Sequence, residues 1–167
     1  MISIEALRGR PVFQIAFVVR DFEAALARYD SVLGAGPFRC FTFGSHMHER
    51  AEYRGEPTEF SANLALNDSA PQFELIQPLS GRGAHQEWLD TKGEGFHHVG
   101  VIVESVETTT AEMNAAGYDT IMAGSGFGRD GDGSYAYYDT AADLGFVVEA
   151  VVPPAAMPEL DFVWPRQ

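Results

Sequence analysis

The stretch GFHHVGVIV, residues 95–103, decides how this chain folds. Its β-branched apolar residues follow a glycine-rich turn, and this pattern predicts a buried strand. A helical pattern comes next, with Ser105 as its N-cap residue. Adjacent residues of a strand point to opposite faces, so at most one of His97 and His98 is expected to face any given cleft.

The same strand-then-helix pattern occurs 84 residues earlier, as QIAFVVRD at residues 14–21. A closing strand repeats as well, because FELI at residues 73–76 aligns with VEAV 75 residues later. The duplication predicts an α+β fold made of two βαβββ modules related by a pseudo-twofold axis. The expected parts are an N-terminal module at 12–80, a C-terminal module at 95–152 and an apolar tail at 153–167, laid across the body over a cleft or on a partner subunit.

The spacing of apolar residues predicts the secondary structure of both modules. Pro78 is expected to end the strand that begins at Gln72, and residues 124–133 are expected to form a flexible, glycine-rich connection. Residues 44–55 are expected to be a loop or an edge hairpin. The expected strands are 12–19, 38–43, 60–66, 72–76, 97–103, 120–123, 135–138 and 145–152, and the expected helices are 22–33, 84–89 and 105–116.

Composition narrows the class of protein. The chain has 167 residues, of which 46% are apolar, so a single domain with a real core is expected. Eleven basic and 24 acidic residues give a formal charge of −13, which disfavours nucleic acid and anionic membranes as partners. Cys40 is the single cysteine, and the sequence has neither a signal-peptide pattern nor a membrane-spanning run. We therefore expect a cytoplasmic protein.

One polar residue interrupts each of the four repeated strands: Gln14, Glu74, His98 and Glu149. An ionised carboxylate inside an apolar strand costs several kcal/mol unless a cation or hydrogen bonds compensate it. The two modules would place all four positions around one concavity. This donor set predicts a divalent metal ion, such as Zn, Ni, Co, Mn or Fe(II). The alternative interpretation is that the glutamates face solvent and the histidine is structural.

The segments FQIAFVVRDFEAALARY, FELIQPLSG, GFHHVGVIVESVE and LGFVVEAV resemble the vicinal oxygen chelate superfamily. That superfamily includes glyoxalases, methylmalonyl-CoA epimerases, ring-cleaving dioxygenases and bleomycin-resistance proteins. The resemblance implies a U-shaped, mixed-sheet cleft and places the four metal positions on Gln14, Glu74, His98 and Glu149. The flanking segments look like the epimerases, although those usually have His in place of Gln14. Glutamine there is found in some glyoxalase I enzymes, but their Asn-Pro-Asp-Gly loop is missing here.

The resemblance also implies a reaction. It predicts a metal-dependent lyase or isomerase in which the metal acts as a Lewis acid on a carbonyl oxygen. Glu149 is the expected ligand and base, and Glu74 is the expected proton donor. Tyr135, Tyr138 and His97 are weaker candidates for orientation or proton relay, and packing in the core is the more frequent role of each.

The substrate is expected to be a small, apolar or aromatic carbonyl compound, because the sequence shows no clear cationic set for glutathione or coenzyme A. A two-His-one-carboxylate dioxygenase site is disfavoured by Gln14. The alternative is a metal-free binding or resistance protein of the same fold, and a homodimer is expected in either case. We expect His98→Ala to abolish metal retention and to leave the fold intact. The aromatic residues available to a pocket are Phe17, Phe38, Phe43, Phe60, Phe127, Tyr137 and Phe146.

Overall fold

A computed structural model describes residues 3–166 of the chain. Its strands are β1 (Val12–Val18), β2 (Phe38–Gly44), β3 (Arg50–Tyr53), β4 (Glu56–Pro57), β5 (Phe60–Leu66), β6 (Gln72–Gly81), β7 (Gly95–Ile102), β8 (Thr120–Phe127), β9 (Gly133–Tyr138), β10 (Val147–Val152) and β11 (Phe162–Trp164). The helices are α1 (Phe22–Leu33), α2 (Ala84–Thr91), α3 (Val106–Ala115) and the short α4 (Ala141–Leu144). A 3₁₀ turn spans Ser45–Met47. Within the described part of the chain, no helix is long and apolar enough to cross a membrane.

The strands of residues 3–166 form one mixed sheet in the order β11-β2-β5-β6-β1-β7-β10-β9-β8-β3-β4. At its centre β1 pairs antiparallel with β7, and each of these strands pairs in parallel with the last strand of its own half. Reading outward from the centre, β1, β6, β5 and β2 are matched by β7, β10, β9 and β8. This matched order confirms the α+β class and the mixed sheet predicted from the repeat. We propose residues 12–80 and 95–152 as the two modules.

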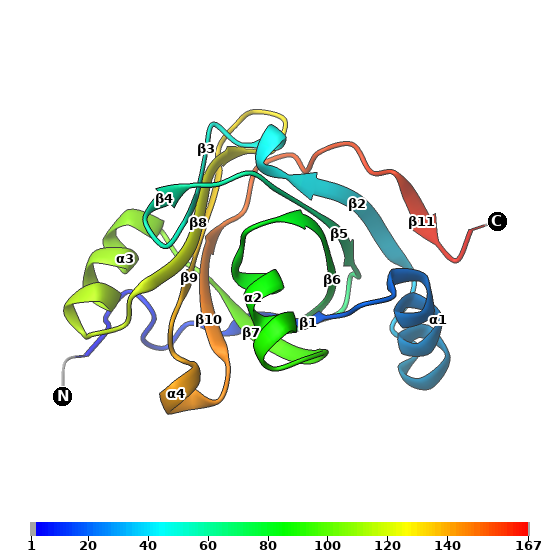
Figure 1. Ribbon diagram of the computed structural model, residues 1–167, viewed down its shortest axis with the longest axis horizontal. Helices are drawn as coiled ribbons and strands as arrows, with labels where there is room; N and C mark the ends of the chain where they lie inside the picture. The colour runs from blue at the N-terminus through cyan, green and yellow to red at the C-terminus, as the bar shows by residue number, and fades with distance from the viewer. Residues whose placement is uncertain (1–2, 167) are drawn as a thin grey trace.

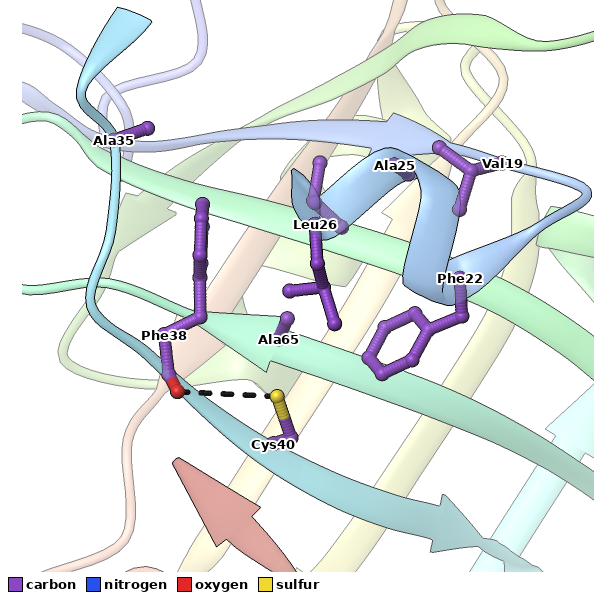
Figure 2. Packing of buried hydrophobic residues seen from close by; sticks show 9 residues of the cluster. Val19, Phe22, Ala25, Leu26, Ala35, Phe38, Cys40 and Ala65 are labelled. Atoms are coloured by element: carbon purple, nitrogen blue, oxygen red, sulfur yellow. Dashed lines mark hydrogen bonds between the residues drawn. The ribbon is translucent and has the colours of Figure 1, made fainter. Parts of the chain in front are cut away.

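The sheet is strongly curved, with α1 and α3 outside it and α2 inside the curve (Figure 1). Helix α1 places Phe22, Ala25 and Leu26 on the outer face, against Phe38, Cys40, Ala65 and Leu75 (Figure 2). Helix α3 buries Met113 against the opposite half in the same way. The outer face is therefore ordinary hydrophobic core, and the inner face is left for a site.

Both long helices begin as the sequence predicts. The Asp21 carboxylate accepts a hydrogen bond from the Ala24 backbone N–H at 3.0 Å, and the Ser105 hydroxyl accepts one from Thr108 at 3.1 Å. These caps satisfy donors that the first turn of a helix leaves free. Gly34 ends α1 in the left-handed conformation, with φ of 62°.

Two local predictions were wrong. Pro78 does not end β6, which continues to Gly81, because a register shift against β5 accommodates the missing N–H. Gly124 is not in a flexible connection but in β8, which runs to Phe127. A Cβ on Gly124 would lie within 2.7 Å of the His48 and Tyr135 rings, so glycine here permits close packing.

Each outer edge of the sheet is completed by a strand from the far half of the sequence. Strand β3, which precedes β5, pairs with β8 from Arg50↔Ser125 to Tyr53↔Met122. Strand β11 pairs with β2, so the segment after Val152 crosses from one half of the molecule to the other (Figure 1). These crossings tie the two arms of the curved sheet together and cover strand edges that would otherwise be open.

Candidate metal centre

Strand register brings the four polar positions of the sequence to one place on the inner face. In one row across the central strands, Gln14 and Glu149 flank Gly100. In the next row, Glu74 and His98 flank Ala16. Residues two apart in a strand share a face, so the two rows lie side by side on the same surface.

Four side-chain atoms converge from these positions. His98 Nε2 lies 3.3 Å from Glu149 Oε2, 3.4 Å from Glu74 Oε2 and 3.4 Å from Gln14 Oε1. All four side chains are buried, with His98 0%, Gln14 6%, Glu74 7% and Glu149 6% exposed. The glutamates therefore do not face solvent, and the expected concavity exists. Their role as metal ligands stays a prediction.

The separations suit a small divalent ion. Zinc binds nitrogen and carboxylate oxygen at about 2.0 to 2.2 Å, which sets neighbouring ligand atoms about 3.0 to 3.5 Å apart. The three distances from His98 Nε2 fall inside this range. One imidazole nitrogen with carboxylate and amide oxygens fits Zn, Ni, Co, Mn or Fe(II) better than a thiolate-seeking ion.

The orientation of Gln14 supports the same interpretation. The Asn67 carbonyl can only accept, and Gln72 Nε2 donates to it at 2.9 Å. Gln72 Oε1 must then face Gln14, whose Nε2 donates to it at 2.9 Å. A rotated Gln14 amide would donate to Glu74 and Glu149 instead, but its oxygen would lie 2.9 Å from Gln72 Oε1, two acceptors in contact. The hydrogen-bond chain thus turns Gln14 Oε1 toward the carboxylates, where it needs a cation.

Without a metal ion, His98 itself supplies positive charge. Burial lowers the pKa of His98, but the nearby Glu149 and Glu74 carboxylates outweigh this and raise it to about 9. Burial raises the pKa of Glu74, and the charge of Glu149 adds to that effect while His98 opposes it. A divalent ion would replace the imidazolium proton as the counter-charge of two buried carboxylates.

The metal-free protein is expected to lose stability as the pH rises from 6.5 to about 9. The folded-state pKa of His98 lies above its ordinary value of 6.5, so protonated His98 contributes its full stabilisation below pH 6.5 and loses it as pH approaches 9. The loss is on the order of 3 kcal/mol. Burial lowers the pKa of His85 and His97, so these residues reduce stability only below pH 6.5. Urea unfolding of chelator-treated protein measures this slope, and a flat or rising profile over that interval would contradict it.

His98 is held by a second histidine. Its Nδ1 lies 2.8 Å from His97 Nδ1, and because burial keeps His97 neutral, His98 donates and His97 accepts. The prediction that only one of the pair faces the cleft is consistent with this arrangement. His85 of α2 joins them, so that one nitrogen from each of the three rings lies within 4.8 Å of the others. In this trio the 2.8 Å contact is a hydrogen bond that orients His98, as metal-binding histidines commonly require.

Small residues between the ligand positions keep the centre open. A Cβ on Gly100 would lie 2.8 Å from the Phe13 ring, 3.1 Å from Gln14 Cβ and 3.2 Å from Gln14 Oε1. A side chain there would push the amide oxygen out of the cluster.

Gly100→Ala is therefore expected to weaken binding of Zn²⁺ or Co²⁺ by about 10- to 100-fold, a size typical of changes that misplace a ligand. Calorimetric titration of the chelator-treated variant measures the affinity. Val99→Ala is the matched control, since Val99 is the neighbouring residue of β7 and packs on the outer face. Equal affinities for Gly100→Ala and the wild type would show that Gln14 is not a ligand.

The cluster opens into a cavity of about 120 Å³. Glu74 and Glu149 form part of its wall, and Pro153, Pro154 and Met157 of the C-terminal segment close one side. Among the described residues that line it, none is a lysine or an arginine. The rest of the wall is mostly apolar and is made by Phe13, Gln14, Phe43, Phe60, Ala62, Leu64, Leu66, Gln72, His85, Phe127, Tyr135, Tyr137 and Val151.

The other residues considered from the sequence divide between the two faces. Tyr135 lines the cavity, but Tyr138 points to the outer core, where its hydroxyl lies 2.9 Å from Thr110 Oγ1. Tyr138 is thus not placed to act on a ligand. Phe17 and Phe38 pack under α1 and Phe146 packs on the outer face, whereas Phe43, Phe60, Phe127 and Tyr137 line the cavity.

Sequence reasoning missed several residues of the site. Gln72 and Asn67 orient Gln14, and Gly100 makes room for it. A signal existed for Gln72, because it lies two residues before Glu74 and so shares its face. His85 lies on the linking helix outside the repeat, and no sequence signal pointed to it.

The comparisons with known proteins follow this geometry. The sequence model of the glyoxalase/bleomycin resistance protein/dioxygenase superfamily matches residues 13–138. The chain belongs to this superfamily. The match spans the first three ligand positions and most of the inner face. No curated protein matches the chain.

Several solved structures share the fold of this superfamily member. A hypothetical protein from Bacillus halodurans C-125 is 18% identical, with 91% of this chain and 99% of that chain covered and a TM-score of 0.62. Methylmalonyl-CoA epimerase from Mycobacterium tuberculosis is 17% identical, with coverage of 92% and 93% and a TM-score of 0.53. A variant of Streptomyces coelicolor methylmalonyl-CoA epimerase, bound to 2-nitronate-propionyl-CoA, is 17% identical, with coverage of 90% and 99% and a TM-score of 0.56. At such identities the likeness shows the fold alone.

Proposed function

We propose that this protein is a metal-dependent isomerase or lyase that removes the proton α to a carbonyl group of a small, apolar or aromatic substrate. The observation that carries the proposal is the convergence of Gln14, Glu74, His98 and Glu149 beside a mostly apolar cavity. A divalent ion bound by these residues would act as a Lewis acid and stabilise negative charge on the carbonyl oxygen, which is worth several kcal/mol.

The two glutamates are suited to move the proton. Glu149 on β10 and Glu74 on β6 both line the cavity and approach His98 Nε2 from different strands. A carboxylate oxygen of Glu149 would take the α-proton, and Glu74 would return a proton to the carbon from its own side. Delivery from the second side inverts the carbon centre, as in an epimerase. Both carboxylates sit in an apolar wall that excludes water and strengthens their interactions with a bound molecule.

The cavity favours a substrate without a large anionic group. Coenzyme A esters carry phosphates, which bind best to Arg, Lys or helix N-termini. The described residues that line this cavity include no Lys or Arg, and the Glu74 and Glu149 carboxylates repel anions. We therefore infer a compact carbonyl compound with an aromatic or branched body, in contrast to the coenzyme A ligand in the Streptomyces coelicolor structure.

Deuterium exchange tests the proposal directly. Protein loaded with Zn²⁺ or Co²⁺ is incubated in D₂O with 2-phenylpropionaldehyde, and in a parallel arm with methylmalonyl-CoA, while NMR follows the α-proton. We expect exchange of the aromatic aldehyde to be accelerated at least about 10²-fold over buffer, the lower end of what a positioned base supplies. Chelation should abolish the acceleration. Metal binding with no exchange of either compound would contradict an isomerase or lyase of this kind.

We further propose that the protein works in the cytoplasm as a homodimer in which each chain holds a complete site. The four ligand positions come from one chain, so a partner is not needed to build the centre. Sedimentation equilibrium measures the assembly state. The single cysteine supports a reducing compartment.

A further inference from the structure

His85 is the buried polar residue whose hydrogen bonding the metal centre does not explain. It lies on α2, lines the cavity and is only 9% exposed. Its Nε2 is buried and has no hydrogen-bond partner among the described residues. The neighbouring rings do not fill this need, since Tyr137 and His97 both meet His85 edge-on, with ring centroids 5.1 and 4.9 Å away.

An unpartnered polar atom in the interior is unusual and costs about 1 to 3 kcal/mol. His97 offers no relief, because its Nδ1 already accepts from His98. The remaining neighbour of His85 is the cavity itself, whose wall is otherwise rich in phenylalanine. A ligand with a polar group at this point would satisfy the imidazole nitrogen.

We propose that His85 Nε2 hydrogen-bonds a polar group of the substrate, so that the site selects a compact, uncharged molecule with an aromatic or branched apolar body and a hydroxyl or carbonyl group directed at α2. Identifying this ligand as the substrate rests on the proposed function, whereas the binding subsite does not. The volume of about 120 Å³ supports the size, since a cavity of about 150 Å³ holds one benzene ring. The carboxylates of Glu74 and Glu149 on the same wall exclude anions.

Phenol and toluene form a matched pair of probes, because they differ by one hydroxyl group in place of a methyl group. Calorimetry on the full-length, chelator-treated protein gives the ratio of the toluene and phenol dissociation constants. In His85→Phe, which keeps a ring and removes both nitrogens, we expect this preference for phenol to fall about 10-fold, the size of one hydrogen bond. His46→Phe removes an exposed histidine outside the cavity and should leave the ratio unchanged.

A second measurement needs no variant. In ¹⁵N NMR of the wild-type imidazole groups, phenol should shift the Nε2 resonance of His85 and toluene should not. An unchanged ratio in His85→Phe, an unmoved His85 resonance, or failure of both probes to bind the wild type at their solubility limits would each overturn the proposal. Because no metal is present in these experiments, their failure is separate from failure of the exchange assay. Loss of exchange activity with an intact phenol preference would overturn only the proposed reaction.

Discussion

Replacing His98 with alanine is expected to lower affinity for Zn²⁺ or Co²⁺ by about 10²- to 10³-fold, since four ligands share a binding energy of about 10 to 16 kcal/mol. The same change is expected to destabilise the metal-free protein by about 3 to 5 kcal/mol, because it leaves two buried carboxylates without a counter-charge. His98 Nε2 lies 3.3 and 3.4 Å from Glu149 and Glu74 in a site that solvent does not reach. Calorimetric titration and urea unfolding measure the two effects.

This expectation corrects the one drawn from the sequence, that His98→Ala would leave the fold intact. The sequence showed a histidine at the start of a strand, but not that its ring is the cation between two glutamates. Adding Glu74→Gln and Glu149→Gln to the His98→Ala variant removes the uncompensated charge. That triple variant should regain stability relative to His98→Ala and should still bind no metal. Equal stability of the two would show that charge is not the reason for the loss.

Glu149→Gln is expected to reduce α-proton exchange by at least about 10³-fold, within the range of lost general-base catalysis. Glutamine keeps the shape and one acceptor oxygen of glutamate but cannot take up a proton at neutral pH. The readout is the rate at which deuterium enters the α-position of the substrate in D₂O. Glu107→Gln, at an exposed position of α3, is the matched control and should exchange at the wild-type rate.

Glu74→Gln separates the two carboxylates. If Glu149 removes the proton and Glu74 returns it on the other face, Glu74→Gln should retain exchange with deuterium and lose inversion of the carbon centre. Chiral chromatography of the recovered substrate measures inversion. Equal loss of exchange and inversion in both variants would contradict the separate roles and would assign both glutamates to metal binding alone.

The repeat predicted much of the site because its physical basis is local. Strand alternation and equal spacing put Gln14, Glu74, His98 and Glu149 on corresponding strands, and the register of β1 with β7 then places them together. The N-caps of α1 and α3 were predictable for the same reason, since a cap depends on a few adjacent residues.

What the sequence did not show depends on tertiary contacts. The link from Asn67 through Gln72 to Gln14 joins a turn to two strands, and no pattern along the chain records it. His85 reaches the cavity only because α2 lies inside the curved sheet (Figure 1). The crossings of β3 and β11 pair strands from opposite halves, and the strand through Pro78 depends on a register shift against β5. Each of these is decided by a neighbour distant in sequence.

X-ray absorption spectroscopy of the Zn²⁺- or Co²⁺-loaded protein tests the identity of the metal centre most directly, because multiple scattering counts the imidazole rings bound to the ion. The His85, His97 and His98 trio is the competing set, with one nitrogen of each ring within 4.8 Å of the others. A centre formed by Gln14, Glu74, His98 and Glu149 gives one imidazole and a remaining shell of oxygen atoms, and His98→Ala removes the bound ion. A spectrum with three imidazole ligands, or a wild-type protein that binds no ion at all, would contradict the account given above.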